Sequence, residues 1–522
     1  MARQIWRGPH IDIPPRTTIL DLIAETAARQ PERVALVNGI SDRTITYVRL
    51  VDSIERVASA LRAGGAGPGS CLAIYAPNSP EWAIAALAIM RLGGTVTGAS
   101  PQFKTDEIVR HLSLTNAHWL LTVPPLLDIA KEAAAKLGGI EVIVEGDRAE
   151  GAISFSELLA GATPADCNTI GQEAPAMLPF SSGTTNLPKP VELTHRALVT
   201  AALQAHAAFG FGPDDRLLAL APFYFIAGSA IILFGGLAMG ASVVTVPRFQ
   251  FESVMDVVER HRISVALFVP PIMRMLAQHP EIEGRDLSHM RLIMCGGAHV
   301  SGAIEEAVAR RFGATVVQAY GTTETSGAIT VSPPTAPRPG TCGKPFPLVE
   351  VRIVDPQTGL DQRSTEIGEV WTRGPQLMKG YFADPEATRE VLSADGWLRT
   401  GDLGFFDMEG YLHLSGRLKD LIKVNAFTVA PMELEALLTT HPAVADAAVV
   451  GRASGKMGEV PVAYIVPRLP IEPDELLRWV AERVAPYKKI RAVELVEDIP
   501  RSPAGKILRR LLTSTGAAEP AP

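Results

Sequence analysis

The chain has 522 residues, with 49 basic and 56 acidic side chains and a net charge of −7. This length is enough for about three or four compact units of ~150 residues each. The slightly acidic balance gives no general attraction to nucleic acid, so we expect no nucleic-acid partner. The aliphatic-rich composition is typical of a globular enzyme with a large core.

Cysteine usage and the amino-terminal segment indicate the compartment. The first ten residues contain no apolar stretch of signal-peptide length. The cysteines form no CxxC pair or Cys/His cluster, which argues against a zinc site and fits a reducing environment; they are Cys71, Cys167, Cys295 and Cys342. We therefore expect a cytoplasmic protein.

Short β-branched runs alternate with helical patterns through the first part of the chain. The alternation predicts an α/β fold with mostly parallel sheets covered by helices on both faces. Ligands of such folds bind beyond the carboxyl ends of strands, where the segments 295–298 and 320–324 lie. The predicted strands are Ser70–Tyr75, Thr95–Thr97, Trp119–Thr122, Val142–Val144, Ser264–Val269, Arg291–Met294 and Thr315–Gln318, and Pro80–Leu92 and Ser253–His261 suit helices.

The segment from Leu217 to Pro247 has no charged residue. Its length would allow a transmembrane helix, which needs about 20 apolar residues. Pro222 and four glycines interrupt it, however, and its end at 241–246 is β-branched. We expect a buried helix followed by a buried strand, with a membrane span as the alternative.

The second half of the chain changes character. Ser332–Pro339 is proline-rich and irregular, and the region that follows, to about Asp407, favours a small β-subdomain. A charged stretch at Arg417–Asp420 separates it from a last unit of about 100 residues, in which Pro431–Thr440 and Glu472–Val484 suit helices. The tail from Ser514 is rich in Ala, Pro and Gly, and we expect it to be disordered.

The loop Phe180–Pro190 reads Phe-Ser-Ser-Gly-Thr-Thr-Asn-Leu-Pro-Lys-Pro. Hydroxyls, free backbone N–H groups and a lysine all donate to phosphate oxygens, so the loop predicts a phosphate-rich ligand. It is not the P-loop of NTPases, because Pro188 and Pro190 stand where that motif needs glycine and a hydroxyl residue. The flanks favour strands, so the loop should be a hairpin tip, with a helix beginning near His195.

Four more segments follow this loop in a fixed order. They are Gln318–Glu324 (Gln-Ala-Tyr-Gly-Thr-Thr-Glu), Arg399–Asp402 (Arg-Thr-Gly-Asp), Ser415–Lys423 (Ser-Gly-Arg-Leu-Lys-Asp-Leu-Ile-Lys) and Pro500–Ile507 (Pro-Arg-Ser-Pro-Ala-Gly-Lys-Ile). The set resembles the adenylate-forming superfamily of acyl-CoA synthetases, carrier-protein adenylation domains and beetle luciferases, and looks like its acyl-CoA synthetase, 4-coumarate–CoA ligase-like branch. The resemblance runs from about residue 20 to about residue 512.

The resemblance implies a fold and a reaction. An amino-terminal domain (residues 1–417) of two helix-covered sheets plus a small β-barrel subdomain would hold the nucleotide and the acid. A small mobile α+β domain (residues 418–522) would pivot between steps about a hinge at Lys419. A carboxylate would attack the α-phosphate of ATP to give acyl-AMP, and a thiol, usually of coenzyme A, would then displace AMP.

The same resemblance assigns the nucleotide site. Thr323 would contact the α-phosphate, Tyr320 the adenine, and Asp402 and Arg417 the ribose, while Glu324 would bind Mg²⁺, which accepts one or two protein carboxylates plus phosphate oxygens. Lys506, on a turn that swings into the site, would neutralise charge in the adenylation step, and Lys423 would serve after the pivot. The remaining implied nucleotide contacts are Ser181, Ser182, Gly183, Thr184, Thr185, Lys189, Gly297, Ala298, Gly321 and Thr322.

The implied acyl pocket is apolar. Amino-acid-activating relatives place an aspartate near the segment that reads Phe223-Tyr224-Phe225 here, and this chain has none. The acid should therefore be hydrophobic and lack an α-amine. The pocket residues are Phe225, Ile226, Gly296, Gly297, Ala298, Ala319 and Ser326.

Several positions depart from the family pattern. Asn186 and Pro190 stand where glycine is usual, Phe225 replaces a histidine, Thr428 replaces a glutamine, and Ala426 replaces a glycine. A proline has no N–H to donate to phosphate. An alternative is therefore an enzyme with weak or lost adenylation that transfers preformed acyl-AMP to coenzyme A. Ala426 favours the reverse alternative, adenylation without coenzyme A chemistry.

Two functions of other classes stay open. The chain could be a non-catalytic protein that binds acyl groups or nucleotides, although the retained charged motif residues argue against it. A luciferase-like oxygenase has no specific support. The acceptor thiol, coenzyme A or a carrier protein, and the oligomeric state, monomer or dimer, stay open as well. Lys488 and Lys489 are candidates for contacting the coenzyme A phosphates.

Overall fold

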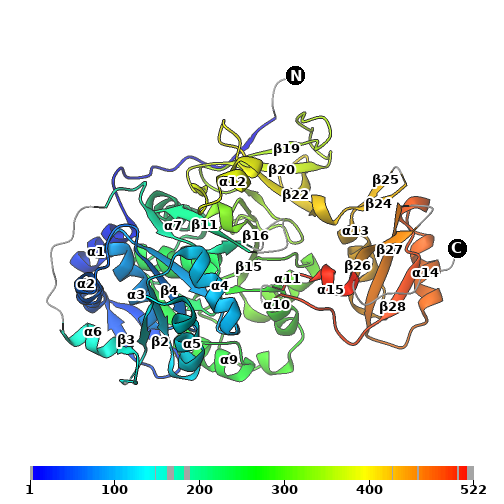
Figure 1. Cartoon of the computed structure of the whole chain (residues 1–522). Coiled ribbons are helices and arrows are strands. Elements are labelled where there is room, and N and C mark those ends of the chain that lie inside the picture. The colour runs from blue at the N-terminus through cyan, green and yellow to red at the C-terminus, as the bar shows by residue number, and fades with distance from the viewer. Residues whose placement is uncertain are drawn as a thin grey trace.

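The computed structural model describes residues 4–146, 148–161, 170–181, 188–425, 427–454, 458–502 and 505–513. Within these residues the strands form four sheets. Two large sheets make the body, an antiparallel sheet lies above them, and a separate sheet lies towards the carboxyl terminus (Figure 1). The predicted α/β class is confirmed.

The first large sheet is parallel at its centre and antiparallel at the edge that carries the hydroxyl-rich loop. Its central strands are buried on both faces, which explains their continuous apolar sequences. In spatial order the strands are β10 (Phe180–Ser181), β11 (Lys189–Thr194), β9 (Pro175–Met177), β5 (Thr95–Ala99), β4 (Cys71–Tyr75), β6 (Trp119–Thr122), β7 (Glu141–Val144) and β8 (Ile153–Ser154), and β21 (Gly380–Tyr381) pairs with β11.

The second large sheet is also parallel at its centre, and its ends β18–β17 and β3 are antiparallel. The carboxyl ends of β15 and β16 lead into the two segments that the sequence places at the site. In spatial order the strands are β18 (Lys344–Pro345), β17 (Thr330–Val331), β16 (Thr315–Tyr320), β15 (Leu292–Cys295), β14 (Val265–Phe268), β12 (Arg216–Ala219), β13 (Ser242–Thr245), β2 (Val34–Asn38) and β3 (Thr44–Thr46).

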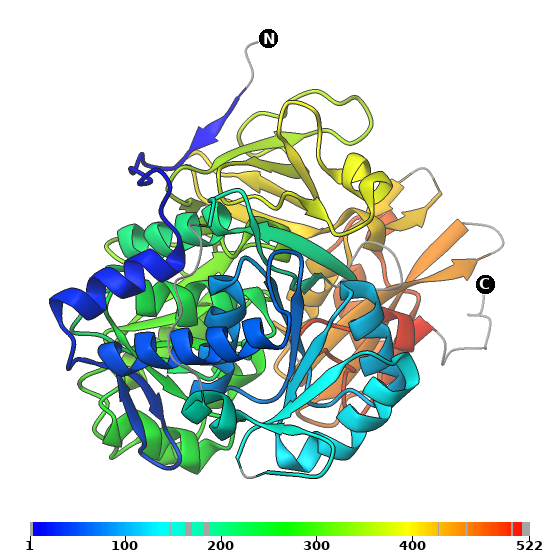
Figure 2. The same ribbon diagram turned by 60° about the vertical axis from the view of Figure 1, so that its left-hand side comes forward.

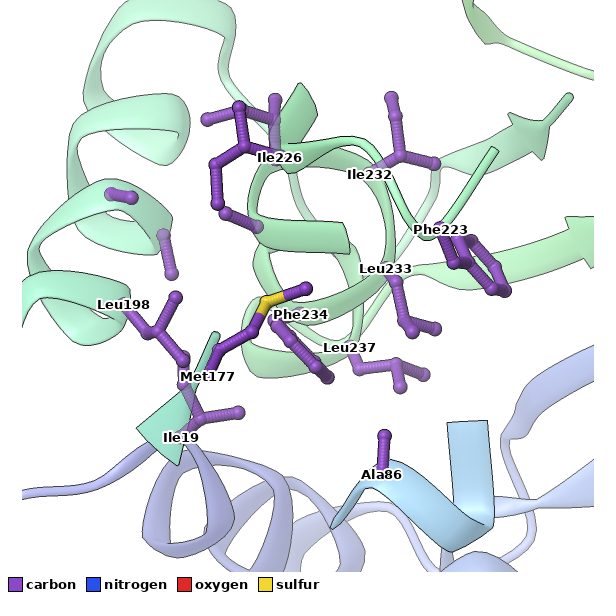
Figure 3. Close-up of a cluster of buried hydrophobic side chains, with 14 of the residues drawn as sticks. Ile19, Ala86, Met177, Leu198, Phe223, Ile226, Ile232, Leu233, Phe234 and Leu237 are labelled. Carbon is purple, nitrogen blue, oxygen red and sulfur yellow. The ribbon is translucent and has the colours of Figure 1, made fainter. Parts of the chain in front are cut away.

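Helices cover these sheets, and the largest hydrophobic cluster lies among them. Figure 3 shows Phe234 and its neighbours packed among Leu198, Ile19, Met177 and Ala86, which come from distant parts of the chain. The helices of the body are α1 (Ile19–Arg29), α2 (Tyr47–Ala63), α3 (Pro80–Arg91), α4 (Thr105–Thr115), α5 (Leu127–Leu137), α6 (Phe155–Gly161), α7 (His195–Phe209), α8 (Gly235–Ala238), α9 (Phe251–Arg260), α10 (Pro270–Leu276), α11 (Gly302–Phe312) and α12 (Pro385–Val391).

The helix predicted near His195 begins at that residue as α7. The Thr194 side chain accepts a hydrogen bond from the Ala197 N–H, and Gly210 ends the helix in the left-handed region at a φ of 66°. A side-chain N-cap of this kind typically stabilises a helix by ~1 kcal/mol. The sequence therefore specifies both ends of the helix that follows the hydroxyl-rich loop.

The uncharged segment 217–247 is buried within the body. Strand β12 comes first, a π-helical stretch η2 (Ala227–Phe234) continues into α8, and β13 follows. The predicted buried helix and strand are both present. Within the parts of the chain that the structure describes, we find no helix whose length and hydropathy would let it span a bilayer.

The predicted small β-subdomain is a curled antiparallel half-barrel. Its strands are β1 (Trp6–Arg7), β19 (Glu350–Val354), β20 (Gly368–Arg373), β22 (Leu398–Phe406) and β23 (Leu412–Arg417). The amino-terminal strand β1 joins its edge, where Trp6 stacks on Phe406 with ring centroids 4.3 Å apart. The sequence did not predict this strand, because two residues carry no periodicity.

The carboxyl-terminal elements have a hydrophobic core of their own. Figure 2 shows them on the far side of the body, with the half-barrel above. They are β24 (Ile422–Val424), β25 (Phe427–Val429), β26 (Val444–Ser454), β27 (Gly458–Pro467), β28 (Ala492–Leu495) and the helices α13 (Pro431–Leu438), α14 (Pro473–Ala481) and α15 (Arg509–Thr513). We call this part of the chain, from residue 422 onward, the C-terminal lobe.

Candidate active site

The strands on either side of the hydroxyl-rich loop pair as a hairpin, as the sequence predicts. β10 and β11 are antiparallel, with Phe180 opposite Pro190 and Ser181 opposite Lys189. Ser181 is buried where the chain enters the loop. Four predicted phosphate contacts, and the departure at position 186, lie outside the described residues: Ser182, Gly183, Thr184, Thr185 and Asn186.

The base of this loop is occupied by an ion pair. The Lys189 Nζ lies 3.1 Å from Asp384 Oδ2 and 5.4 Å from the ring centroid of Tyr381. Pro190 lies within β11, and its carbonyl accepts a hydrogen bond from the Phe382 N–H. The lysine therefore has an acidic partner within this chain, which the sequence pattern did not reveal.

Glu324 is held by the segment around β21. The Tyr381 hydroxyl donates to Glu324 Oε1 at 2.9 Å, and the Met378 N–H donates to the Glu324 carbonyl at 2.8 Å. Burial, followed by the charge of Glu324, raises the pKa of Tyr381, so its phenol stays protonated as a donor. Sequence pattern alone does not single out Tyr381, because its partner Glu324 lies 57 residues away.

The turn after β16 brings backbone into close contact with backbone. A Cβ atom at Gly321 would lie 1.7 Å from the carbonyl oxygen of Gly327, so only glycine fits there. Thr323 and Glu324 follow in a 3-10 turn, η4 (Thr323–Thr325), whose N-cap is Thr322. Ser326 comes next, fully buried and in the left-handed region at a φ of 52°.

Tyr320, Asp402 and Arg417 meet in one cluster. The Tyr320 hydroxyl donates to Asp402 Oδ2 at 2.7 Å, and Arg417 Nε lies 2.9 Å from Asp402 Oδ1. Burial, followed by the charge of Asp402, raises the pKa of Tyr320 well above its ordinary value. The structure thus brings together three residues that the sequence assigned to adenine and ribose from three separate motifs.

The glycine-rich segment after β15 lies beside this turn. Gly297 is in the left-handed region at a φ of 87°, and a Cβ atom at Gly296 would lie 3.2 Å from the Ala319 carbonyl oxygen. Because β15 and β16 are parallel neighbours, their carboxyl ends meet at one edge of the sheet. Gly296 therefore lies next to Ala319, and the two segments start at the same edge of the sheet.

Lys506 comes to this site from the C-terminal lobe. Burial and the nearby Arg417 lower the pKa of Lys506, while the carboxylates of Asp402 and Glu324 act in the opposite direction. The preceding turn packs on the body, because a Cβ atom at Gly505 would lie 2.9 Å from Pro271 Cδ at the start of α10. The lobe is therefore docked with Lys506 near the nucleotide residues.

The residues predicted to act after a pivot lie elsewhere. Lys423 is exposed in β24, and its backbone N–H donates to Glu459 Oε2 at 2.7 Å. Among the contacts of the described residues, none joins Lys423 to Tyr320, Glu324 or Asp402. Lys419 lies in the short 3-10 turn η5 (Leu418–Asp420) that connects β23 to the lobe. Lys488 forms an ion pair with Glu433.

Two aromatic side chains are in contact in the segment that the sequence assigns to the acyl pocket. Tyr224 and Phe225 are in ring contact at 4.5 Å, directly before Ile226 and the π-helical stretch η2. π-Helical turns occur often at functional sites. A Cβ atom at Gly98 of β5 would lie 2.7 Å from Tyr224 Cα, so the first sheet abuts this segment. Sequence pattern alone does not single out Gly98 or Tyr224 as neighbours of the predicted pocket.

The described residues contain no group of three or more His, Cys, Asp or Glu side chains arranged to hold a metal ion. A substrate-borne Mg²⁺ needs only one or two protein carboxylates, because phosphate oxygens and water supply the other ligands. Glu324 fits that requirement. Cys71, Cys295 and Cys342 are buried and free, and Cys167 lies outside the described residues.

Residues 23–382 match the family of AMP-binding enzymes, and residues 433–506 match the C-terminal domain of AMP-binding enzymes. The chain belongs to the AMP-binding enzyme family. Within the family it is 37% identical to 4-coumarate–CoA ligase 5 of Oryza sativa subsp. japonica, over 98% of this chain and 97% of the relative. It is 36% identical to a 4-coumarate–CoA ligase of Vanilla planifolia, over 98% of this chain and 96% of the relative.

Solved members of the family share the whole fold. The ATP-bound MatB of Rhodopseudomonas palustris superposes with a TM-score of 0.88 at 29% identity, over 96% of this chain and 99% of that one. An anthranilate CoA ligase in complex with anthranoyl-AMP also gives 0.88, at 27% identity, over 96% and 98%. This AMP-binding enzyme is thus an adenylate-forming acid–thiol ligase by family.

Proposed function

We propose that the enzyme joins a hydrophobic carboxylic acid without an α-amine to coenzyme A through an acyl-adenylate. The observation that carries this proposal is the meeting of Asp402 with Tyr320 and Arg417, and the approach of Lys506 and its surroundings to the same cluster. The proposal includes a division into residues 1–417 and 418–522, with a hinge near Lys419.

In the first step a carboxylate oxygen attacks the α-phosphorus of ATP, the bond to the pyrophosphate oxygen breaks, and pyrophosphate leaves. Asp402 and Arg417 bind the ribose, Tyr320 lies against the adenine, and Thr323 donates to the α-phosphate. The Lys506 ammonium stabilises the negative charge that grows on the phosphate oxygens. Glu324 would hold Mg²⁺, which would supply positive charge to the phosphates.

In the second step the coenzyme A thiol, after losing its proton to solvent, attacks the acyl carbonyl carbon. The carbon–oxygen bond to AMP breaks, and AMP leaves with the electron pair. Lys423 and its hairpin β24–β25 face the nucleotide in this step after the lobe turns about Lys419. We assign Lys423 to this step because it lies away from the nucleotide cluster in the docked arrangement.

The acyl group lies against Phe225, Ile226, Gly296, Ala319 and Ser326. The described part of this segment offers no carboxylate at positions 223–225 to pair with a substrate ammonium, which favours an apolar acid. Because relatives are named for 4-coumarate and anthranilate, aryl acids are among the first substrates to test. The experiment is to measure pyrophosphate release and thioester formation with aryl, short-chain and amino acids as substrates.

A second candidate function is thioester formation from supplied acyl-AMP, with adenylation weak or lost. Two observations favour it: Phe225 stands at a position where the family often has histidine, and Lys189 is paired with Asp384 rather than free. Pyrophosphate release from ATP and an acid at ordinary rates would rule it out. Thioester formation from acyl-AMP without pyrophosphate release from ATP would support it.

A further inference from the structure

The strand that carries Asp402 departs from regular pairing directly at that residue. Between β20 and β22 the register places Glu369 opposite Leu403 but Trp371 opposite Arg399. The three residues 400–402 therefore lie opposite the single residue Val370, which makes a bulge. Gly401 occupies the left-handed region at a φ of 69° within it.

A buried carboxylate holds this bulge. Glu369 is 7% exposed, and its Oε1 accepts a hydrogen bond from the Gly401 N–H at 3.0 Å. Its Oε2 accepts from the Trp371 Nε1–H at 2.7 Å. Thr400 completes the arrangement, because its hydroxyl donates to the Val370 carbonyl at 2.7 Å and accepts from the Asp402 N–H at 3.1 Å.

The indole that anchors Glu369 is itself fixed. The guanidinium of Arg352 lies 4.5 Å from the Trp371 ring centroid and that of Arg399 lies 4.8 Å from it. Cation–π contacts of this kind restrain an aromatic ring. Both oxygens of Glu369 thus accept hydrogen bonds from groups with little freedom to move. The position of the carboxylate therefore fixes the position of the Gly401 peptide.

We propose that Glu369 is a positioning residue for nucleotide binding, acting through the Gly401 peptide to aim the Asp402 carboxylate at the ribose. This inference rests on the proposed function in one respect, the assignment of Asp402 to the ribose hydroxyls. Glu369 need not touch the nucleotide. A carboxylate suits the task, because hydrogen bonds from N–H groups to an ionised acceptor are shorter and stronger than neutral ones.

The test measures ribose recognition by the full-length chain, without requiring turnover. Binding of AMP, 2′-deoxy-AMP and 3′-deoxy-AMP is followed by calorimetry. For the wild type we expect AMP to bind about tenfold more tightly than at least one deoxy analogue, the effect of a hydrogen bond to a charged acceptor. In Glu369→Ala the preference should fall below about threefold, because Asp402 is no longer aimed. Asp402→Asn serves as the reference for a complete loss of this preference.

Matched variants separate positioning from a general structural role. Trp371→Phe removes the N–H that anchors Glu369, whereas Trp397→Phe removes a buried N–H that has no hydrogen-bond partner within the described chain. We expect only the first to reduce the ribose preference. Glu350→Ala removes a carboxylate of the same half-barrel, bonded to Arg7 and Arg373, and should keep the wild-type preference.

Each outcome decides a question. A folded Glu369→Ala variant with the wild-type preference overturns the inference, as does an equal loss in Trp371→Phe and Trp397→Phe. If Glu369→Ala does not fold, the ribose preference is measured in Glu369→Gln and Trp371→Phe instead. A wild type that binds AMP and its deoxy analogues equally overturns the assignment of Asp402 and the inference with it. A wild type that prefers AMP but forms no acyl-CoA contradicts the proposed function alone.

Discussion

Lys506 meets charges of both signs when the lobe is docked. Arg417 lies near it as a like charge, and Asp402 and Glu324 attract it. An ammonium that is partly buried is desolvated in advance, so its effect on charge developing at phosphate is larger than it would be in water. Lys423, by contrast, is exposed on β24 in this arrangement.

The two lysines should therefore affect different half-reactions. Lys506→Ala should lower the rate of pyrophosphate release by about 10²–10³ and leave transfer from supplied acyl-AMP to coenzyme A within a few-fold of wild type. Lys423→Ala, the matched control, should show the reverse pattern. Stopped-flow measurement of each half-reaction checks this, and equal losses in both assays for Lys506→Ala would refute the assignment.

We expect Glu305 to make the free energy of unfolding depend on pH. It is 2% exposed on α11, and its Oε1 accepts from the Gln318 amide at 2.8 Å and from the Gly340 N–H at 3.3 Å. Burial raises the pKa of Glu305 to about 7 from an ordinary value of 4.5. Between these two values the unfolded chain has released a proton that the native state retains.

The free energy of unfolding should therefore fall as pH rises from about 4.5 to about 7, by up to about 1.4 kcal/mol per pH unit from this group, and level off above. Glu305→Gln keeps a carbonyl acceptor but cannot titrate, so it should flatten this part of the profile. Glu306→Gln, the exposed neighbour whose charge adds a smaller part to the shift, should change the profile much less. Urea unfolding across this pH range provides the measurement, and parallel profiles for wild type and Glu305→Gln would contradict the prediction.

At the scale of elements, strand ends and their turns shape the site. The turn from β16 into η4 returns so tightly that Gly321 touches the backbone of Gly327, and Gly327 in turn lies against Ile231 of the π-helical stretch. This one turn thus carries Tyr320, Glu324 and Ser326, to which we assign the adenine, Mg²⁺ and the acid. The register of β20 and β22 likewise sets the position of Asp402.

Adding one methyl group at Gly321 should disrupt this turn. Overpacking of this kind typically costs 1–3 kcal/mol, and the backbone contact at 1.7 Å places Gly321→Ala at or beyond the upper end of that range. We expect a lower melting temperature and at least about tenfold weaker AMP binding. Gly171→Ala is the control, because a Cβ atom there meets no atom within 4 Å. Near-wild-type binding by Gly321→Ala would show that the turn can adapt.

At the scale of the whole molecule, one arginine connects the Lys506 segment to the proposed hinge. Arg509 of α15 lies 3.4 Å from Asp420, which follows Lys419, and it donates to the Val449 carbonyl at 2.7 Å. It also pairs with Glu435 of α13, at 3.1 Å from Nη2 to Oε2. The turn that carries Lys506 and the connection to the body therefore belong to one tightly bonded unit.

Arg509→Ala should loosen this unit without unfolding the body. Loss of charged hydrogen bonds in a partly buried setting costs about 2 kcal/mol or more. We expect faster hydrogen exchange in α13 and α15, slower pyrophosphate release, and unchanged protection of the central strands β4 and β15. Arg510→Ala, at the exposed neighbouring position, is the control. Equal exchange rates in Arg509→Ala and Arg510→Ala would argue against the coupling.

Local sequence pattern alone determined many of the secondary-structure elements and the family motifs of this protein. The strands β4, β6 and β16, the helix α7 and the hairpin around residues 180–190 follow from apolar period, capping residues and turn residues, which act over a few positions. The five motifs likewise indicate the family because each is a short run. Elements of two residues, such as β1 and β21, escaped prediction because they depend on pairing with distant strands.

Only the tertiary structure decided which side chains meet. Tyr381 with Glu324, Lys189 with Asp384, and Glu369 with Gly401 are contacts between segments 57, 195 and 32 residues apart. No local period encodes such a pair, because each partner's burial and direction are fixed by sheet register and by packing of separate elements. The sequence by itself determined the elements and the identity of the motif residues; the register of β20 and β22 and the docking of the C-terminal lobe determined how those residues face one another.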